Sequence, residues 1–289
     1  MMYDTILVPT DGSGGAEAAA RHGLRLASAF DSEVRFLSVV DRRSYSGDLA
    51  GVDSLVDDQR DALVEGATNN LRPLEDLATE TAVPFESSIE HGIPHKAIFE
   101  YADEHDIDMV VMGTHGRTGL QRVLIGSVTE RVVRTSDIPV LTTRAVPNER
   151  SSYEDVLIPT DGSDAASAAI DHGLTIAERC DATVHALSVV DVSSLADSYN
   201  VAPIIEAWKD DCERAVAEVA KAAESRDIDV TTEVKQSTPY RAIKMYVENK
   251  EVDLVAMGTH GRTGLERYLV GSVTTRTVRT SDVPVLTVR

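Results

Sequence analysis

The nine residues Met-Gly-Thr-His-Gly-Arg-Thr-Gly-Leu, at positions 112–120, recur letter for letter at positions 257–265. Each copy runs on to a Gly-Ser pair, at positions 126–127 and 271–272. Two further stretches repeat. Val-Pro-Thr-Asp-Gly-Ser at 8–13 returns with one conservative change at 158–163, and Leu-Ser-Val-Val-Asp at 37–41 returns unchanged at 187–191. The chain therefore carries one glycine-rich site twice.

The repeat also predicts the domain organisation. A chain of 289 residues is long enough for two domains, each able to bury its own core. Between the repeats, residues 147–152 are polar and begin with a proline, as is typical of a linker. We expect a first domain over residues 1–146 and a second over 153–289.

Composition limits the partners and the compartment. The net charge of −20 disfavours nucleic acid, because nonspecific binding to phosphates depends on Lys and Arg. Six of the 28 basic residues are Lys, which together with the acid excess suggests a high-salt habitat such as that of a halophilic archaeon.

Neither cysteine lies in a CxxC pair, so no disulfide framework or zinc site is indicated. No leader peptide or long apolar run is evident, and we expect a cytoplasmic protein without a membrane segment.

Apolar runs that end at turn residues alternate with helical patterns along the first half. The patterns predict strands over 6–8, 33–40, 85–90, 109–112 and 139–142, and helices over 16–30, 52–78, 94–105 and 127–136. This alternation predicts an α/β fold, an open parallel sheet with helices on both faces. Such sheets bind ligands beyond the carboxyl ends of their strands, where Asp11, Asp41 and Gly113 are expected.

The glycine spacing indicates a phosphate site. Gly113 and Gly116 follow a strand, where glycine permits a positive φ and a close approach of the backbone. Gly126 and Ser127 open a helix, whose N-terminus attracts anions. Neither the Walker pattern nor the dinucleotide fingerprint occurs in the chain.

Several ordered motifs resemble those of the universal stress protein family, in its ATP-binding branch, in both halves of the chain. They are Val-Pro-Thr-Asp at 8–11, Gly-Ile-Pro-His at 92–95, the glycine loop, and Ser-Asp-Ile-Pro-Val-Leu at 136–141. The resemblance implies two tandem Rossmann-like domains, of the adenine nucleotide alpha hydrolase-like kind, each with a five-stranded parallel sheet. It implies an ATP-binding stress-response regulator, with ATP or another adenine nucleotide bound with or without Mg²⁺. It also implies an intrachain pseudo-dimer through the last strands, and leaves a homo-oligomer open.

The resemblance carries over to particular residues. Asp11 and Asp161 would bond ribose or adenine, Val40 and Val190 would lie against the base, and the glycines and serines would hold phosphates. The expected nucleotide-binding residues of the first half are Pro9, Thr10, Asp11, Val40, Met112, Gly113, His115, Gly116, Arg117, Gly126, Ser127 and Val128. Those of the second half are Pro159, Thr160, Asp161, Val190, Met257, Gly258, His260, Gly261, Arg262, Gly271, Ser272 and Val273.

Simpler roles compete with these. Asp11 could serve only to start a turn, Ser127 could be only a helix cap, and Arg117 could point to solvent. His115 lacks a visible carboxylate partner, so we expect no catalytic role for it. At the level of function, a slow ATPase or nucleotidyl transferase and a scaffold with an empty pocket remain alternatives.

The two copies differ in ways that favour the first site. The Gly-Ile-Pro of residues 92–94 becomes Ser-Thr-Pro at 237–239, and the capping-box pattern at 127–130 loses its carboxylate at 272–275. We therefore expect the first site to bind at least as well as the second.

Overall fold

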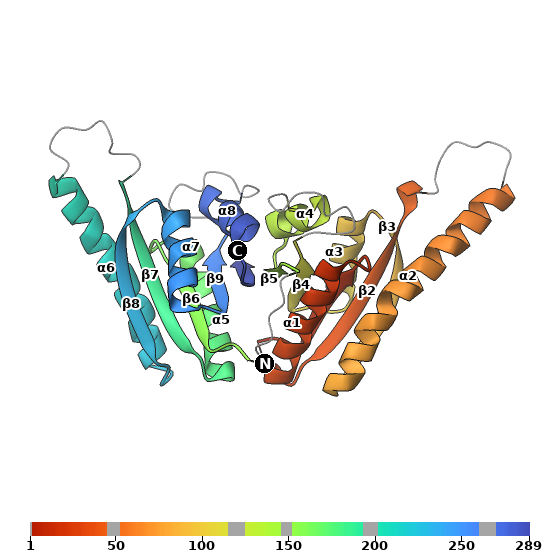
Figure 1. Ribbon diagram of the computed structural model, residues 1–289, viewed down its shortest axis with the longest axis horizontal. Coiled ribbons are helices and arrows are strands. Elements are labelled where there is room, and N and C mark those ends of the chain that lie inside the picture. Colours follow the sequence, from red (N-terminus) through yellow and green to blue (C-terminus); the bar gives the residue numbers. More distant parts are fainter. Residues whose placement is uncertain (1, 45–52, 115–124, 146–151, 193–201, 260–269) are drawn as a thin grey trace. The chain divides into compact units, whose positions relative to one another are not determined.

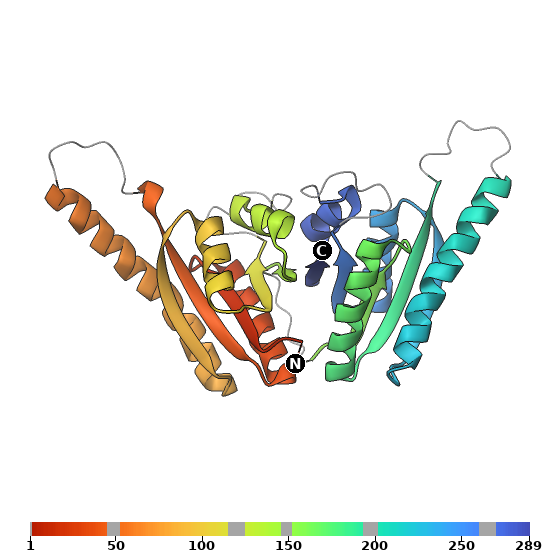
Figure 2. The same cartoon turned by 180° about the vertical axis from the view of Figure 1, so that it is seen from behind.

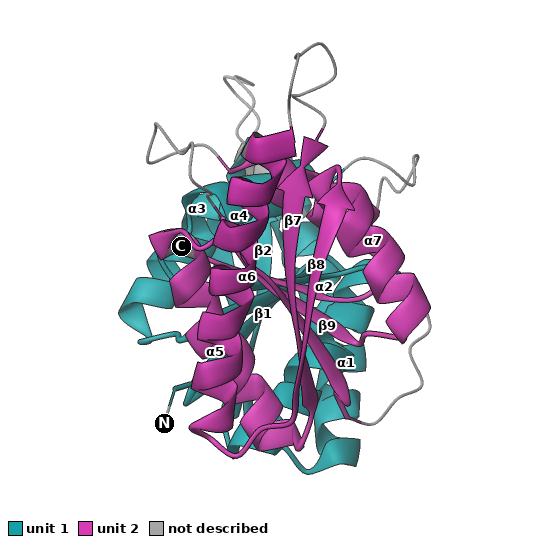
Figure 3. Cartoon of the chain, turned by 90° about the vertical axis from the view of Figure 1, so that its left-hand side faces the viewer, with its two compact units in different colours: residues 1–148 teal, residues 149–289 magenta. Residues whose placement is uncertain are grey.

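The computed structural model describes residues 2–44, 53–114, 125–145, 152–192, 202–259 and 270–289. The chain forms two compact units, Met1–Asn148 and Glu149–Arg289, which Figure 3 colours separately. Across the described ranges, no helix combines the length and the apolar character needed to cross a bilayer.

The first unit is built on a five-stranded parallel sheet with the order β3-β2-β1-β4-β5. Its strand order reverses beside β1, which lies between β2 and β4. The strands are β1 (Thr5–Thr10), β2 (Glu33–Asp41), β3 (Phe85–Gly92), β4 (Met109–Gly113) and β5 (Val140–Thr143).

Helices cover both faces of this sheet (Figures 1 and 2). Helices α1 (Gly14–Phe30) and α2 (Asp53–Thr81) contact each other and pack on one face, and α3 (Pro94–Glu104) packs against α4 (Ser127–Thr135) on the other. A short 3-10 helix, η1 (Arg42–Ser44), follows β2.

The second unit repeats this architecture, with the strand order β8-β7-β6-β9-β10. Its strands are β6 (Asp155–Pro159), β7 (Thr183–Asp191), β8 (Val230–Ser237), β9 (Leu254–Gly258) and β10 (Val285–Val288). Its helices are α5 (Asp164–Cys180), α6 (Ala202–Glu224), α7 (Pro239–Lys250) and α8 (Ser272–Thr280). The predicted α/β class with a parallel sheet in each half is confirmed.

The sequence patterns that predicted the elements have clear physical counterparts. Ile6, Leu7 and Val8 are fully buried, as expected of a central strand covered on both faces. The Ser13 hydroxyl caps α1 by accepting a hydrogen bond from the Ala16 backbone N–H at 3.3 Å. Asp31 ends the helix in the left-handed conformation, with φ of 57°.

Gly113 has a steric function at the end of β4. A Cβ atom on Gly113 would lie 2.6 Å from both the carbonyl carbon and the carbonyl oxygen of Gly15 in the first turn of α1. Among the described glycines, the positive φ angles occur at Gly12 and Gly162, with values of 76° and 73°. A glycine after β4 was expected either for a positive φ or for a close approach of the backbone. At Gly113 the reason is the close approach to α1.

This geometry predicts opposite effects for two glycine-to-alanine changes. Gly113→Ala would force the α1 backbone away from β4 and should lower the free energy of unfolding by roughly 2 kcal/mol. Gly66→Ala is the control, since a Cβ there meets nothing within 4 Å and α2 gains helix propensity. The control should be more stable by about 0.5–1 kcal/mol. Denaturant titration of the full chain measures both, and equal stability of the Gly113→Ala protein would contradict the steric argument.

His22 makes the first domain sensitive to acid. It lies on α1 and is 5% exposed, and burial, reinforced by the charge of Arg25, lowers its pKa to about 3. The unfolded chain, with a His pKa near 6.5, then binds the proton more readily than the folded chain. His22 therefore costs stability as pH falls from about 6.5 toward 3, and it has no such effect above 6.5.

We expect wild type to lose about 1 kcal/mol more per pH unit below pH 6 than a His22→Gln variant. Urea unfolding of both proteins between pH 7 and pH 4.5 provides the measurement. Parallel pH profiles for the two proteins would show that His22 is protonated without cost.

Candidate functional site

A cleft of about 300 Å³ lies at the carboxyl ends of β1, β2 and β4 in the first domain. It sits where the strand order reverses between β1 and β4, the usual ligand position in open parallel sheets. Its lining residues come from β1, α1, β2, α3, β4 and α4 and the adjoining turns: Pro9, Thr10, Asp11, Ser13, Ala16, Leu37, Val39, Pro94, Ile98, Met112, Gly113, Gly126, Ser127, Val128 and Thr129.

The turn after β1 is held by its own side chains. The hydroxyl of Thr10 accepts from the backbone N–H of Gly12 at 3.1 Å, and Asp11 Oδ1 accepts from the backbone N–H of Ser13 at 3.1 Å. Asp11 thus plays the turn-forming role that the sequence left open. Its exposed carboxylate also lines the cleft, so the turn role and a ligand role are compatible.

The N-terminus of α4 forms the opposite wall. Gly126 occupies the N-cap position, with φ of −61°, so Ser127 is the first helical residue. As a glycine, Gly126 makes no side-chain capping bond. Thr129 is turned away from its own helix, because its hydroxyl donates to the Gly113 carbonyl at 2.8 Å. The predicted capping box over residues 127–130 is therefore wrong, since the helix starts one residue earlier than that pattern requires. Ser127 is exposed at the cleft instead.

Apolar side chains from two elements line the rest of the cleft. Leu37 and Val39 come from β2, while Pro94 and Ile98 come from α3. The sequence interpretation placed the neighbouring Val40 against a base. Successive side chains of a strand point to opposite faces, and Val40 is 3% exposed without lining the cleft.

Four of the lining residues were not among the binding residues expected from the sequence, although local sequence spacing could have indicated which of them share a face. They are Leu37, Val39, Pro94 and Ile98. The period of two places Leu37 and Val39 on one face of β2, and the i, i+4 spacing places Pro94 and Ile98 on one face of α3. Which of the two strand faces meets the cleft depends on the crossover helices, and this the period alone does not reveal.

The second domain reproduces the same frame of hydrogen bonds. Backbone N–H groups donate to Thr160 Oγ1 and Asp161 Oδ1 at 3.1 Å and 3.0 Å, and Thr274 donates to the Gly258 carbonyl at 2.8 Å. The Gly271 N–H donates to the Thr259 carbonyl at 2.7 Å, matching the bond from Gly126 to Thr114.

The remaining expected residues of the second domain occupy corresponding places. Met257 is buried beside Gly258 at the end of β9, and Pro159 ends β6. Val190 is buried on β7, like Val40 on β2. Ser272 and Val273 begin α8 after the N-cap Gly271.

Six expected residues lie outside the described part of the chain. They belong to the middle of the two glycine loops: His115, Gly116, Arg117, His260, Gly261 and Arg262.

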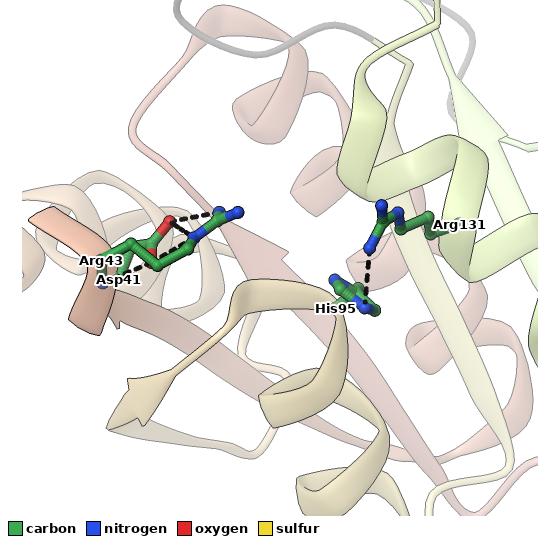
Figure 4. Close-up of polar contacts among 4 residues, drawn as sticks. All are labelled: Asp41, Arg43, His95 and Arg131. Carbon is green, nitrogen blue, oxygen red and sulfur yellow. Dashed lines mark hydrogen bonds and ion pairs between the residues drawn. The ribbon is translucent and has the colours of Figure 1, made fainter.

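Two polar pairs of the first domain are Asp41 with Arg43 and His95 with Arg131 (Figure 4). Arg43 forms an ion pair with Asp41 at 2.6 Å and, by hydrogen bonding to its carboxylate, lowers the pKa of Asp41. Arg131 of α4 lies 3.3 Å from Nε2 of His95 on α3, and burial together with Arg131 lowers the pKa of His95. In the described part of the chain, no group of three or more His, Cys, Asp and Glu side chains could hold a metal ion.

These features define a tandem α/β protein of Rossmann-like class, with a site at the carboxyl edge of the first sheet and the same local frame in the second. The chain belongs to the universal stress protein family, whose model matches residues 2–144 and again residues 152–289.

The chain is similar to several individual proteins. A universal stress protein of Methanocaldococcus jannaschii is 39% identical over 147 residues, covering 50% of this chain and 86% of its own. The crystal structure of a universal stress protein from Archaeoglobus fulgidus is 19% identical, with a TM-score of 0.73 over 100% of this chain and 99% of that one. Another universal stress protein was crystallised in complex with cAMP; it is 24% identical, with a TM-score of 0.36, over 48% of this chain and 98% of its own.

The bond between Thr129 and Gly113 offers a test of how α4 is held. Thr129→Val keeps the shape of a side chain that is 5% exposed but removes the donor to the Gly113 carbonyl. We expect a loss of about 1–3 kcal/mol in the free energy of unfolding. Thr274→Val should cost a similar amount in the second domain, where the matching bond has the same length. Unchanged midpoints in guanidinium unfolding for both variants would show that these two hydrogen bonds do not stabilise the position of α4 or α8.

Proposed function

We propose that this protein binds an adenine nucleotide, ATP in the first instance, and that the bound nucleotide governs its part in a stress response. The binding places are the cleft of the first domain and the corresponding position in the second. One observation carries the proposal: an apolar wall and an open helix N-terminus face the same cleft at the carboxyl edge of the sheet. Its volume of about 300 Å³ falls at the lower end of the usual range for small-molecule sites.

The apolar wall suits a flat base. Leu37, Val39 and Ile98 surround this part of the cleft, together with Met112. Strand β2 also runs beyond β1, because the last pair between them is Thr10 with Ser38, while β2 continues beside β3 to Asp41. The main chain of Val39 to Asp41 therefore extends past β1 at the cleft, where its peptide groups could pair with the polar edge of a base.

The helix wall suits phosphate. The first N–H groups of α4 have no partner within the helix, and the positive end of the helix dipole lies there. Gly126 lacks a side chain that could cap them, and the exposed Ser127 hydroxyl adds a further donor. An anion bound at this point would satisfy several donors at once.

The two sites are more alike in structure than in sequence. The capping box that favoured the first site does not form. A Cβ on Gly92 would lie 3.4 Å from the Ala97 Cβ, an ordinary contact, so the Ser237 that replaces this glycine in the second half needs no rearrangement. That the first site binds at least as well as the second stays a prediction, and it no longer has the support of these two sequence differences.

Pairing of the two domains through their last strands, association between chains and location in the cytoplasm also stay predictions. The same holds for the nature of the nucleotide and for any role of Mg²⁺.

Denaturation of the purified full chain, followed by identification of the released nucleotide, is the first experiment. We expect up to two adenine nucleotides per chain, or the same stoichiometry after loading with ATP. No nucleotide by either route would refute the proposal. Steady release of phosphate or pyrophosphate with Mg²⁺ would favour the enzymatic alternative over a regulatory role.

Charge substitutions locate the phosphate. Ser127→Glu places a carboxylate on the first turn of α4, where it suits the helix dipole but repels phosphate. We expect this variant to lose one bound ATP per chain, Ser272→Glu to lose the other, and both to keep their stability. Ser127→Gln and Ser272→Gln are the size-matched neutral controls, and calorimetric titration provides the stoichiometry. Equal loss in the Gln and Glu variants would show that bulk, and not charge, is responsible.

A further inference from the structure

The helices that wall the cleft of the first domain are joined by a contact between His95 and Arg131 (Figure 4). His95 directly follows the cleft residue Pro94, and it lies three residues before the cleft residue Ile98, so His95 and Ile98 share one side of α3. Arg131 lies three and four residues after Val128 and Ser127, which places it on their side of α4. The contact therefore bridges α3 and α4 at the edge of the cleft.

The direction of this hydrogen bond defines the state of the histidine. A guanidinium can only donate, so Nε2 of His95 must accept at 3.3 Å and carries no proton. A protonated His95 would present a donor to a donor, and two positive charges would face each other. Protonation of His95 thus breaks the contact and leaves two cations at the edge of the cleft.

The charges that act on His95 come from three elements. They are Arg131 on α4, Lys96 on α3 and Arg43 on η1, whose partner Asp41 closes β2. With burial, they lower the pKa of His95. A negatively charged ligand in the cleft has the opposite effect, because it stabilises the protonated ring.

The second domain holds the same positions with different chemistry. Tyr240 follows Pro239 as His95 follows Pro94, and Arg276 corresponds to Arg131 in the 145-residue offset of the repeat. The guanidinium carbon of Arg276 lies 4.8 Å from the centroid of the Tyr240 ring, a cation–π contact. The hydrogen bond that Arg241 donates to the Tyr240 hydroxyl lowers the pKa of this phenol from its ordinary value near 10. Neither the neutral nor the ionised ring gains a positive charge in the range in which histidine does, so the contact with Arg276 does not become a contact between two cations.

We propose that His95, through its contact with Arg131, makes nucleotide binding by the first domain pH dependent, whereas Tyr240 and Arg276 leave the second domain without this dependence. The inference rests on the proposed nucleotide function. By linkage, the first site binds the anionic nucleotide more tightly as pH falls through the pKa of His95, by up to roughly tenfold for each unit by which the ligand raises that pKa. A duplicated site thereby responds in two ways to one change in acidity.

The test uses the full chain with one site silenced at a time. A Ser272→Glu background reports the first site and a Ser127→Glu background reports the second. ATP affinity is measured by calorimetry at pH 8 and pH 5.5 at constant ionic strength. The phosphate chain of ATP also gains a proton in this range, with a pKa near 6, but this affects both sites and cancels in the ratio of their affinities.

We expect this ratio to shift severalfold toward the first site at pH 5.5. Reciprocal exchange then supplies matched variants: His95→Tyr should abolish the shift, and Tyr240→His should install it in the second site. His95→Gln serves as a second non-titrating variant, and thermal unfolding checks that each variant folds.

Three outcomes separate the possibilities. Absence of ATP binding at both pH values and both sites removes the proposed function, and this inference with it. Binding with a ratio that does not change with pH, or a shift that survives in both His95 variants, overturns the inference alone. A shift that follows the histidine from one domain to the other supports it.

Discussion

The close approach of the β4 terminus to the first turn of α1 is the constraint on which the first domain depends. A side chain at Gly113 would overlap the Gly15 backbone, and the Gly113 carbonyl also accepts the hydroxyl of Thr129 in α4. One peptide thus joins the central sheet to the beginnings of two helices. Because this residue ends a central strand, the same contacts place both helix N-termini at one edge of the sheet.

That arrangement creates the cleft. The chain leaves β1 through a turn closed by Thr10 and Asp11, which aims the N-terminus of α1 toward the sheet edge. The start of α4 approaches from the other side, and Leu37, Val39 and Ile98 complete an apolar surface between them. A site with helix dipoles at one end and apolar side chains at the other suits a ligand with a flat ring and a negatively charged tail.

Duplication preserved this frame while the edge of the site changed. The bonds of Thr10, Asp11 and Thr129 recur at Thr160, Asp161 and Thr274 with lengths within 0.1 Å. On α3 of the first copy lies His95, and the matching position on α7 of the second copy is Tyr240. Backbone geometry tolerates little change, because it positions the helices, whereas side chains at the rim can vary without disturbing the sheet. Divergence there changes the response of a site and leaves its architecture intact.

The elements, the α/β class and the duplication followed from the sequence alone, because buried parallel strands and amphipathic helices leave patterns that neighbouring residues determine. The turn residues Thr10 and Asp11 and the anion-attracting start of α4 were identifiable for the same reason. Only the tertiary structure decided that Gly126 and not Ser127 occupies the N-cap position of α4, since Thr129 bonds to a strand residue 16 positions earlier. It also decided that Val39 and not Val40 faces the cleft, and that Gly113 is needed for contact with α1. These features depend on residues distant in the chain, and local patterns carry no record of which distant groups will meet.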